Sequence, residues 1–365
     1  MSDRPAAKRP GRLGKVLRCI IFLGLIYFGA LAFSYIVRQT PTRFAKERFP
    51  AFYAEPDYRY SVVELGSSAC NRYLDPFVLY EKFDILSYNL GTPLQPPVST
   101  SFIMDEVEKS QDPELYVVEC REFLFLEEDK LEQALYCVTD SMDVSLTKWQ
   151  MISRAYDTLG EKITAFFDVV KYHSYWPRIR EYHLQFWDNR KLSDIKSWDP
   201  HEGYRVFEAP DLKSLEYEPL DEENEALLRE LLDICTEKKR KVLFVVVPYT
   251  RSKYIKHSGR IQALKKIVEE YGFDFLDLTD GEAYGLDYSR DFHDVRHVNN
   301  VGADKVTNEL GKYIKEHYGI TSDIPDEMKA AWDEAARKNR EAIEYHAANP
   351  QALDETEDTT HLFDV

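Results

Sequence analysis

Cysteine is scarce in this 365-residue chain, which has five, at positions 19, 70, 120, 137 and 235. None of them stands in a CxxC spacing, which argues against a zinc knuckle or a redox pair. The spacing indicates no particular disulfide, so we expect buried free thiols.

Basic residues are also in deficit. The 47 lysines and arginines face 64 aspartates and glutamates, and the formal net charge is -17. This balance argues against a surface that binds nucleic acid, so no nucleic-acid partner is expected. An acidic surface by itself identifies no other partner.

Only one stretch, Cys19–Val37, is long, apolar and uncharged. At about 1.5 Å per residue it would reach roughly 28 Å, close to the thickness of a bilayer core. A cleaved signal peptide is the alternative, since Ala30–Ala32 could serve as a cleavage site. The apolar run continues past that point, so we favour an uncleaved anchor. Six basic residues precede it: Arg4, Lys8, Arg9, Arg12, Lys15 and Arg18.

This charge pattern predicts that residues 1–18 stay in the cytoplasm, that 19–37 cross the cell membrane once, and that the remainder is extracytoplasmic. Residues 38–58 then read as a linker. An α/β domain is expected over 59–320, followed by a segment, 321–365, that is helical and then acidic and disordered.

Apolar runs alternate with helical patterns in the main domain. We expect strands at "SVVEL", "ILSYNLG", "ELYVVECREF", "KVLFVVVP" and "FDFLDL". Such alternation predicts a three-layer α/β/α fold with a mostly parallel sheet. A helical insertion at about 127–190 interrupts it. An apolar stripe in the insertion is expected to be core, and it comprises Ile152, Tyr156, Leu159, Ile163, Phe166 and Val170.

Sites of open α/β sheets lie at the carboxyl ends of strands. There the sequence places "GSS" (66–68), "NLG" (89–91) and "ECRE" (119–122), and after the last strand "DFHDVRHVNNVGAD" (291–304). A serine becomes nucleophilic when a base takes its proton and a third group orients that base. Asp294 and His297, three residues apart, can supply orienter and base.

The pattern resembles the SGNH/GDSL hydrolase superfamily, in which Gly-Asp-Ser follows the first strand, Gly the second and Asn the third, with D-x-x-H near the C-terminus. "GSS" matches the first block with Ser67 in the aspartate position, and "NLG" supplies the second through Gly91. "DVRH" supplies Asp294 and His297, and Asn299 and Gly302 match the continuation into the last helix.

The resemblance implies that Ser68, Asp294 and His297 are catalytic and that Ser68 and Gly91 line the oxyanion hole. Where the family has its oxyanion asparagine, this chain has Arg121, whose guanidinium can also donate hydrogen bonds. The chain is most similar to anchored members resembling the teichoic-acid D-alanylation and polysaccharide O-acetylation proteins. That similarity implies an esterase or O-acyltransferase acting on an envelope polysaccharide or teichoic acid, without a cofactor, with a multi-pass membrane acyltransferase as candidate partner.

Other interpretations use the same residues. Asp291, His293, Asp294 and His297 could be read as metal ligands, but no third ligand is evident on a common face, so no metal is expected. "GSS" and Asp294 could simply cap helices. His173, Trp176 and Arg180 in the insertion could bind a sugar or an anionic polymer, or could be a packed helix end. A non-catalytic anchored module that binds glycan or a partner is the rival function.

Overall fold

Five apolar runs form one parallel sheet in the computed structural model, which describes residues 11–37, 48–125, 131–179, 192–212, 216–250 and 259–353. The strand order is β2-β1-β3-β4-β5. This confirms an α/β fold with a parallel sheet, and each expected run contains one strand. The strands are β1 (Val62–Leu65), β2 (Ser87–Asn89), β3 (Leu115–Glu119), β4 (Val242–Val246) and β5 (Asp274–Asp277).

The inner strands are buried along their whole length. Every residue of β1, β3 and β4 is buried, whereas the edge strand β5 exposes its two ends. Unbroken apolar runs suit a parallel sheet that is covered on both faces. In the sheet, β1 lies between β2 and β3. The connections therefore diverge between the carboxyl ends of β1 and β3, where a crevice for a ligand opens in such sheets.

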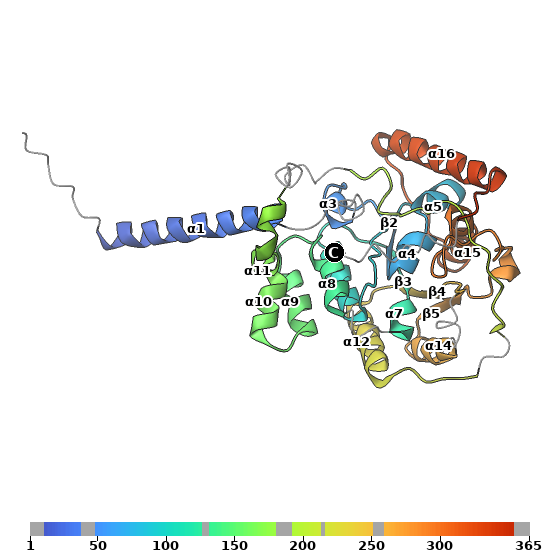
Figure 1. The fold of residues 1–365 in the computed structure, drawn as a ribbon, viewed down its shortest axis with the longest axis horizontal. Helices are drawn as coiled ribbons and strands as arrows, with labels where there is room; N and C mark the ends of the chain where they lie inside the picture. Colours follow the sequence, from blue (N-terminus) through green and yellow to red (C-terminus); the bar gives the residue numbers. More distant parts are fainter. Residues whose placement is uncertain are drawn as a thin grey trace, which may run out of the picture.

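Two groups of helices pack on the sheet (Figure 1). One group follows β1 and β5, and its members contact one another: α4 (Ser68–Tyr73), α5 (Pro76–Phe83), α15 (Asn300–Tyr318) and α16 (Asp326–Ala348). The other group comprises α6 (Thr100–Val107), α7 (Arg121–Leu124), α12 (Glu222–Lys238) and α14 (Arg260–Glu270). Short elements complete the fold: α3 (Phe49–Phe52), η1 (Pro97–Ser99) and η6 (Gly281–Tyr284).

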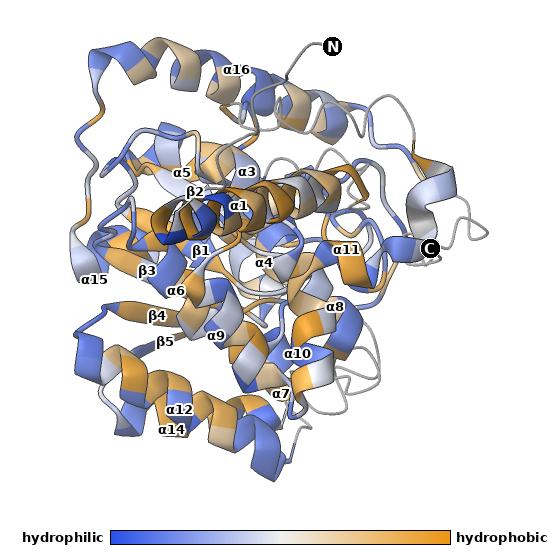
Figure 2. Ribbon diagram, turned by 90° about the vertical axis from the view of Figure 1, so that its left-hand side faces the viewer, coloured by the Kyte–Doolittle hydropathy of each residue, from blue (hydrophilic) through white to orange (hydrophobic). Residues whose placement is uncertain are grey.

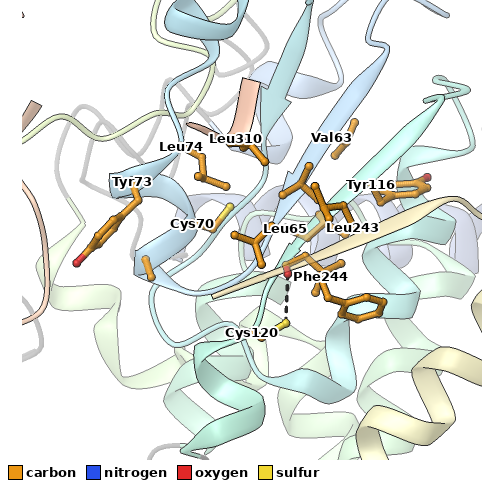
Figure 3. Packing of buried hydrophobic residues seen from close by; sticks show 14 of the residues in the cluster. Val63, Leu65, Cys70, Tyr73, Leu74, Tyr116, Cys120, Leu243, Phe244 and Leu310 are labelled. Atoms are coloured by element: carbon orange, nitrogen blue, oxygen red, sulfur yellow. Dashed lines mark hydrogen bonds between the residues drawn. The ribbon is translucent and has the colours of Figure 1, made fainter. Parts of the chain in front are cut away.

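The core lies between the sheet and these helices. Figure 3 shows part of this core: Val63 and Leu65 of β1, Leu243 and Phe244 of β4, Cys70 of α4, Leu74 just after it, and Leu310 of α15. Cys70, Cys120 and Cys235 are buried free thiols, as expected, while Cys137 is half-buried and Cys19 is exposed on the first helix.

The packed unit extends past both predicted borders of the domain, and the segment after residue 320 is helical, as expected. Phe49 and Phe52 of α3, in the predicted linker, are fully buried. Beyond the predicted C-terminal border, Trp332 of α16 is 2% exposed and packs against Phe77 and Tyr80 of α5. The packed unit therefore begins before residue 59 and ends after residue 320. The acidic tail from residue 354 lies outside the described residues.

The insertion between β3 and β4 is helical, as predicted. It contains α8 (Leu131–Thr139), α9 (Leu146–Ala155), α10 (Leu159–Phe166), α11 (Asp168–Lys171) and η3 (His173–Arg178). The prediction that its apolar stripe is core is wrong: Ile152 is buried, but Leu159, Ile163 and Val170 are exposed. The stripe does not run along one helix, because Thr158 caps a new helix together with Glu161.

The N-terminal helix α1 (Arg12–Val37) is long and apolar enough over Arg12–Ser34 to cross a membrane. It begins earlier than the predicted segment and includes three of the basic residues, Arg12, Lys15 and Arg18. It projects from the rest of the molecule, whereas Ser34 and Val37 at its end are buried (Figure 1). The basic residues before Gly11 lie outside the described residues.

Candidate active site

The carboxyl ends of β1 and β3 are joined by a hydrogen bond from Ser67. Its hydroxyl donates to Oε2 of Glu119 at 2.8 Å and accepts from the N–H of Ala69, the second residue of α4. Glu119 also accepts the backbone N–H of Arg121. Burial raises the pKa of Glu119, although Arg121 and Ser67 counteract this. Ser67 is thus the cap of α4 and a partner of a buried carboxyl group.

Ser68 points the other way, toward the loop before α15. Its Oγ lies 2.8 Å from Nε2 of His297, and its side chain is only partly buried. Gly66, with φ of +145°, makes the turn from β1 possible, since a Cβ there would lie 2.7 Å from Cβ of Glu119. The local backbone therefore distinguishes the two serines, and only Ser68 faces the histidine.

His297 is held on its other side by Asp294. Nδ1 of His297 lies 3.1 and 3.0 Å from the two carboxylate oxygens of Asp294. Oδ1 of Asp294 also accepts the backbone N–H groups of Arg296 and His297, at 2.6 and 2.9 Å. These contacts fix the carboxylate, and they favour the tautomer in which Nδ1 carries the proton and Nε2 presents its lone pair to Ser68.

The charges of this pair follow from burial and proximity. Burial lowers the pKa of His297 to about 4, because Asp294 counteracts only part of the loss of solvent. Burial disfavours the Asp294 carboxylate, but His297 and the N–H of Arg296 outweigh it and hold the pKa of that carboxyl below its usual range. At neutral pH the structure thus contains a neutral imidazole beside a carboxylate, the state that a general base requires.

The residues predicted for the oxyanion hole are placed differently. As the first residue of α4, Ser68 has an N–H that the helix itself does not use. The N–H of Gly91, by contrast, donates to Oδ1 of Asn89 at 3.0 Å. In this structure the N–H of Gly91 is therefore already bonded within the chain, and its role as an oxyanion donor stays a prediction. Gly91 instead allows close packing, since a Cβ would lie 2.9 Å from N of Asn71.

Arg121 is 2% exposed and lies at the same edge of the sheet. Its Nη2 donates to the carbonyl of Arg296 at 2.9 Å, and its guanidinium lies 5.1 Å from the ring centre of Tyr249. Tyr73, whose ring extends from the core cluster in Figure 3, donates to the same carbonyl at 3.1 Å. Arg121 therefore supports the residue before His297, and a contact with an oxyanion stays a prediction.

Two further histidines line up beside His297. The ring of His293 stacks on that of His201 at 4.0 Å, and His201 lies 5.9 Å from the ring of His297. Nearby, Asp199 forms an ion pair with Arg72 of α4. Burial and Arg72 lower the pKa of His201 well below its usual value. His201 was not predicted, because a lone histidine in a polar loop about a hundred residues away carries no signal of this contact.

The turn into α15 is built as the sequence predicts. Asn299 caps the helix by accepting the N–H of Gly302 at 3.0 Å. A Cβ on Gly302 would lie 2.5 Å from the carbonyl oxygen of Asp291, so only glycine fits. Asp291 accepts from Nζ of Lys305 at 2.7 Å, and Nδ1 of His293 contacts the carbonyl of Glu202.

Within the described residues, no group of three or more His, Cys, Asp or Glu side chains could hold a metal ion.

The predicted substrate-binding group of the insertion lies on η3, which packs against α1 and α11. Nδ1 of His173 contacts the carbonyl of Val170, and the Trp176 side chain is 65% exposed. Arg180 lies outside the described residues. Among the described residues, neither His173 nor Trp176 forms a hydrogen bond or ring contact with Ser68, His297 or Asp294, so a role in binding the substrate stays a prediction.

Comparison with known proteins adds no family. No protein-family model and no curated protein matches the chain. Among solved structures, an endoglucanase is similar at 9% sequence identity over 71% of this chain and 99% of its own, with a TM-score of 0.18. So low a score supports no argument about fold or function.

Proposed function

We propose that this protein is a membrane-anchored, extracytoplasmic SGNH-like serine esterase or O-acyltransferase that acts on acyl groups of cell-envelope polysaccharide or teichoic acid. The observation that carries the proposal is the continuous chain from Ser68 Oγ through His297 to Asp294. The blocks that the resemblance requires follow β1, β2 and β3 and precede α15, which supports the assignment.

In the proposed reaction, Ser68 Oγ attacks the carbonyl carbon of an acyl ester while Nε2 of His297 takes its proton. Asp294 stabilises the imidazolium that forms. The N–H of Ser68, which α4 does not use, would donate to the developing oxyanion. The tetrahedral intermediate then expels the alcohol, which receives the proton from His297, and the acyl group remains on Ser68.

Either water or a polymer hydroxyl can accept the acyl group in the second half. His297 takes the proton of the acceptor, the acceptor oxygen bonds to the acyl carbon, and Ser68 Oγ leaves with the proton. Water gives a free acid, whereas a hydroxyl gives a new ester. An anchor in α1 would keep the site close to envelope polymers and to a multi-pass membrane acyltransferase as acyl donor, which favours transfer.

A fluorophosphonate probe tests the nucleophile directly. We expect one covalent adduct on Ser68 of the full-length protein in detergent, located by peptide mass spectrometry, because the probe reacts with serines that a base has activated. Ser68→Ala and His297→Ala should lose the adduct. Ser67→Ala is the matched control: it should remain labelled at Ser68, while losing about 1–2 kcal/mol of stability through its helix cap and its bond to Glu119. An adduct on Ser67, or none on the folded wild type, would contradict the proposal.

The acid side of the pH profile should reflect His297. We expect kcat/KM for a chromogenic acetyl ester to fall as the pH drops through about 4, because protonated His297 cannot accept the proton of Ser68. Activity should stay level from about pH 5.5 to about pH 7, because His297 is then almost fully neutral. Circular dichroism at each pH separates titration from unfolding. An acid limb centred near the ordinary histidine value of about 6.5 would show that the site does not lower this pKa.

A further inference from the structure

Four apolar side chains of the insertion, only three of which belong to the predicted core stripe, face outward and make up an exposed stripe. Leu159, Ile163, Phe167 and Val170 are 65, 38, 38 and 40% exposed. Leu159 and Ile163, four residues apart, lie on one side of α10. Phe167 lies at the junction of α10 and α11, and Val170 lies on α11, which contacts α10. Exposed apolar side chains that gather on neighbouring elements are a mark of an interaction site.

The stripe belongs to a well-packed element. Thr158 and Glu161 form a capping box at the start of α10, and Ala165 is buried on its inner side. The ring of Phe166 contacts those of Trp149 on α9 and Phe167, at 5.2 and 5.0 Å. The same helix thus packs inward with one side and leaves its other apolar side uncovered in the described structure.

The stripe continues into the region around the end of α1. α11 and η3 both contact α1, and η3 carries Trp176, which is 65% exposed. In Figure 1, α10 and α11 lie at the edge of the domain from which α1 projects. Figure 2, viewed from that side, shows hydrophobic segments on α10 and α11, with α11 next to the end of α1. The uncovered surface therefore begins where the apolar helix meets the domain.

We infer that Leu159, Ile163, Phe167, Val170 and Trp176 insert into the interfacial layer of the same lipid bilayer that α1 spans. This inference rests on the membrane anchoring proposed above. Lipid fits better than a protein partner, because a surface adjoining the end of a membrane span lies at the depth of the headgroups. Amphipathic helices bind there through their apolar side, and exposed tryptophan is enriched at that depth.

A second contact with the bilayer changes what the anchor does. A single helix lets the attached domain tilt and rotate about the helix axis. Contact through α10, α11 and η3 as well fixes which face of the domain lies against the membrane. The edge of the sheet that carries Ser68 then has a set orientation relative to membrane-bound acyl donors and polymer acceptors.

Site-specific photo-crosslinking tests this contact. The full-length protein, reconstituted into vesicles of phosphatidylethanolamine and phosphatidylglycerol with an alkyne-tagged tracer lipid, carries benzoylphenylalanine at Ile163 or Val170. Leu25 of α1 (67% exposed) is the positive control, and Val206 (71% exposed and away from the stripe) is the matched negative control. We expect lipid adducts at Leu25, Ile163 and Val170, with yields several-fold above that at Val206.

The outcomes separate the two proposals. Adducts at Leu25 but background yields at Ile163 and Val170 would overturn the interfacial contact and leave the anchor intact. Crosslinks from Ile163 to a second copy of the chain would overturn it in favour of a protein interface. Background yields at Leu25 as well would overturn the anchor, and the contact that depends on it. Labelling of Ser68 by the fluorophosphonate probe is independent of all three.

Discussion

We expect Ser68→Ala and His297→Ala each to lower kcat/KM for an activated acetyl ester by at least about 10³-fold, and the double variant to be little worse than either. The reason is that the serine and the histidine act as one unit, joined by the 2.8 Å contact between Oγ and Nε2. Without the imidazole the hydroxyl keeps its proton, and without the hydroxyl the imidazole has nothing to activate. Steady-state hydrolysis by the purified full-length protein in detergent measures these ratios.

The matched control is His293→Ala. His293 lies four residues from His297 and stacks on His201, but its Nδ1 contacts the carbonyl of Glu202 instead of Ser68. We expect a much smaller loss, confined to the packing of the loop. Equal losses in His293→Ala and His297→Ala would mean that loop integrity, and not base catalysis, determines the rate. An inactive wild type that still binds envelope glycan would favour the non-catalytic module.

Asp294→Asn extends the same test to the third residue. An amide cannot hold the tautomer in which Nδ1 of His297 donates, so a loss of about 10³- to 10⁴-fold is expected at neutral pH. The fold should survive, because the amide oxygen can still accept the N–H groups of Arg296 and His297.

The parts of this structure that were predicted correctly are those with a local cause. The strand Val242–Val246 is apolar on both faces. Such a run is typical of a parallel strand that is covered by helices on both sides. One tight turn determines two further residues: Gly302 has no room for a Cβ, and Asn299 accepts the N–H of Gly302. Ser68, Asp294 and His297 could be placed together because residues after parallel strands gather at one edge of the sheet.

The features that the sequence did not reveal have several causes. The N–H of Gly91 is taken by Asn89, and no pattern in "NLG" separates a free N–H from a bonded one. His201 reaches the site through a long connection that has no periodic signal. The apolar stripe is different, since Thr158-x-x-Glu161 is a readable capping box that marks a new helix. Even so, its residues are as apolar as core residues, so sequence alone does not separate burial in protein from burial in lipid.

The second large effect concerns stability and comes from Glu64, a buried acid in the inner strand β1. We expect Glu64→Gln to raise the free energy of unfolding relative to the wild type, by an amount that grows as the pH rises from 5 to 8. Burial raises the pKa of Glu64 from 4.5 to about 8, and the neighbouring Ser87 offsets only part of this. The folded protein therefore keeps a proton that the unfolded chain releases.

The sign follows from proton binding. Between pH 4.5 and about 8 the folded state binds more protons than the unfolded state, so the wild type loses stability as the pH increases. At about 1.4 kcal/mol per pH unit, the loss reaches the order of 4 kcal/mol near pH 8. Glutamine has no proton to release and escapes this loss. Urea unfolding of both proteins in detergent, at several pH values, measures the difference.

The test is how the difference in free energy of unfolding between Glu64→Gln and wild type changes with pH. A poor fit of the amide group would shift this difference by the same amount at every pH. Glu223→Gln, at an exposed position in the first turn of α12, is the matched control for the removal of one carboxylate. A difference between Glu64→Gln and wild type that stays constant from pH 5 to 8 would show that Glu64 is ionised in the folded protein. Glu64 lies in β1, the strand that leads through Gly66 and Ser67 into α4 and Ser68. The stability lost at alkaline pH would therefore be lost in the strand that precedes the helix of Ser68.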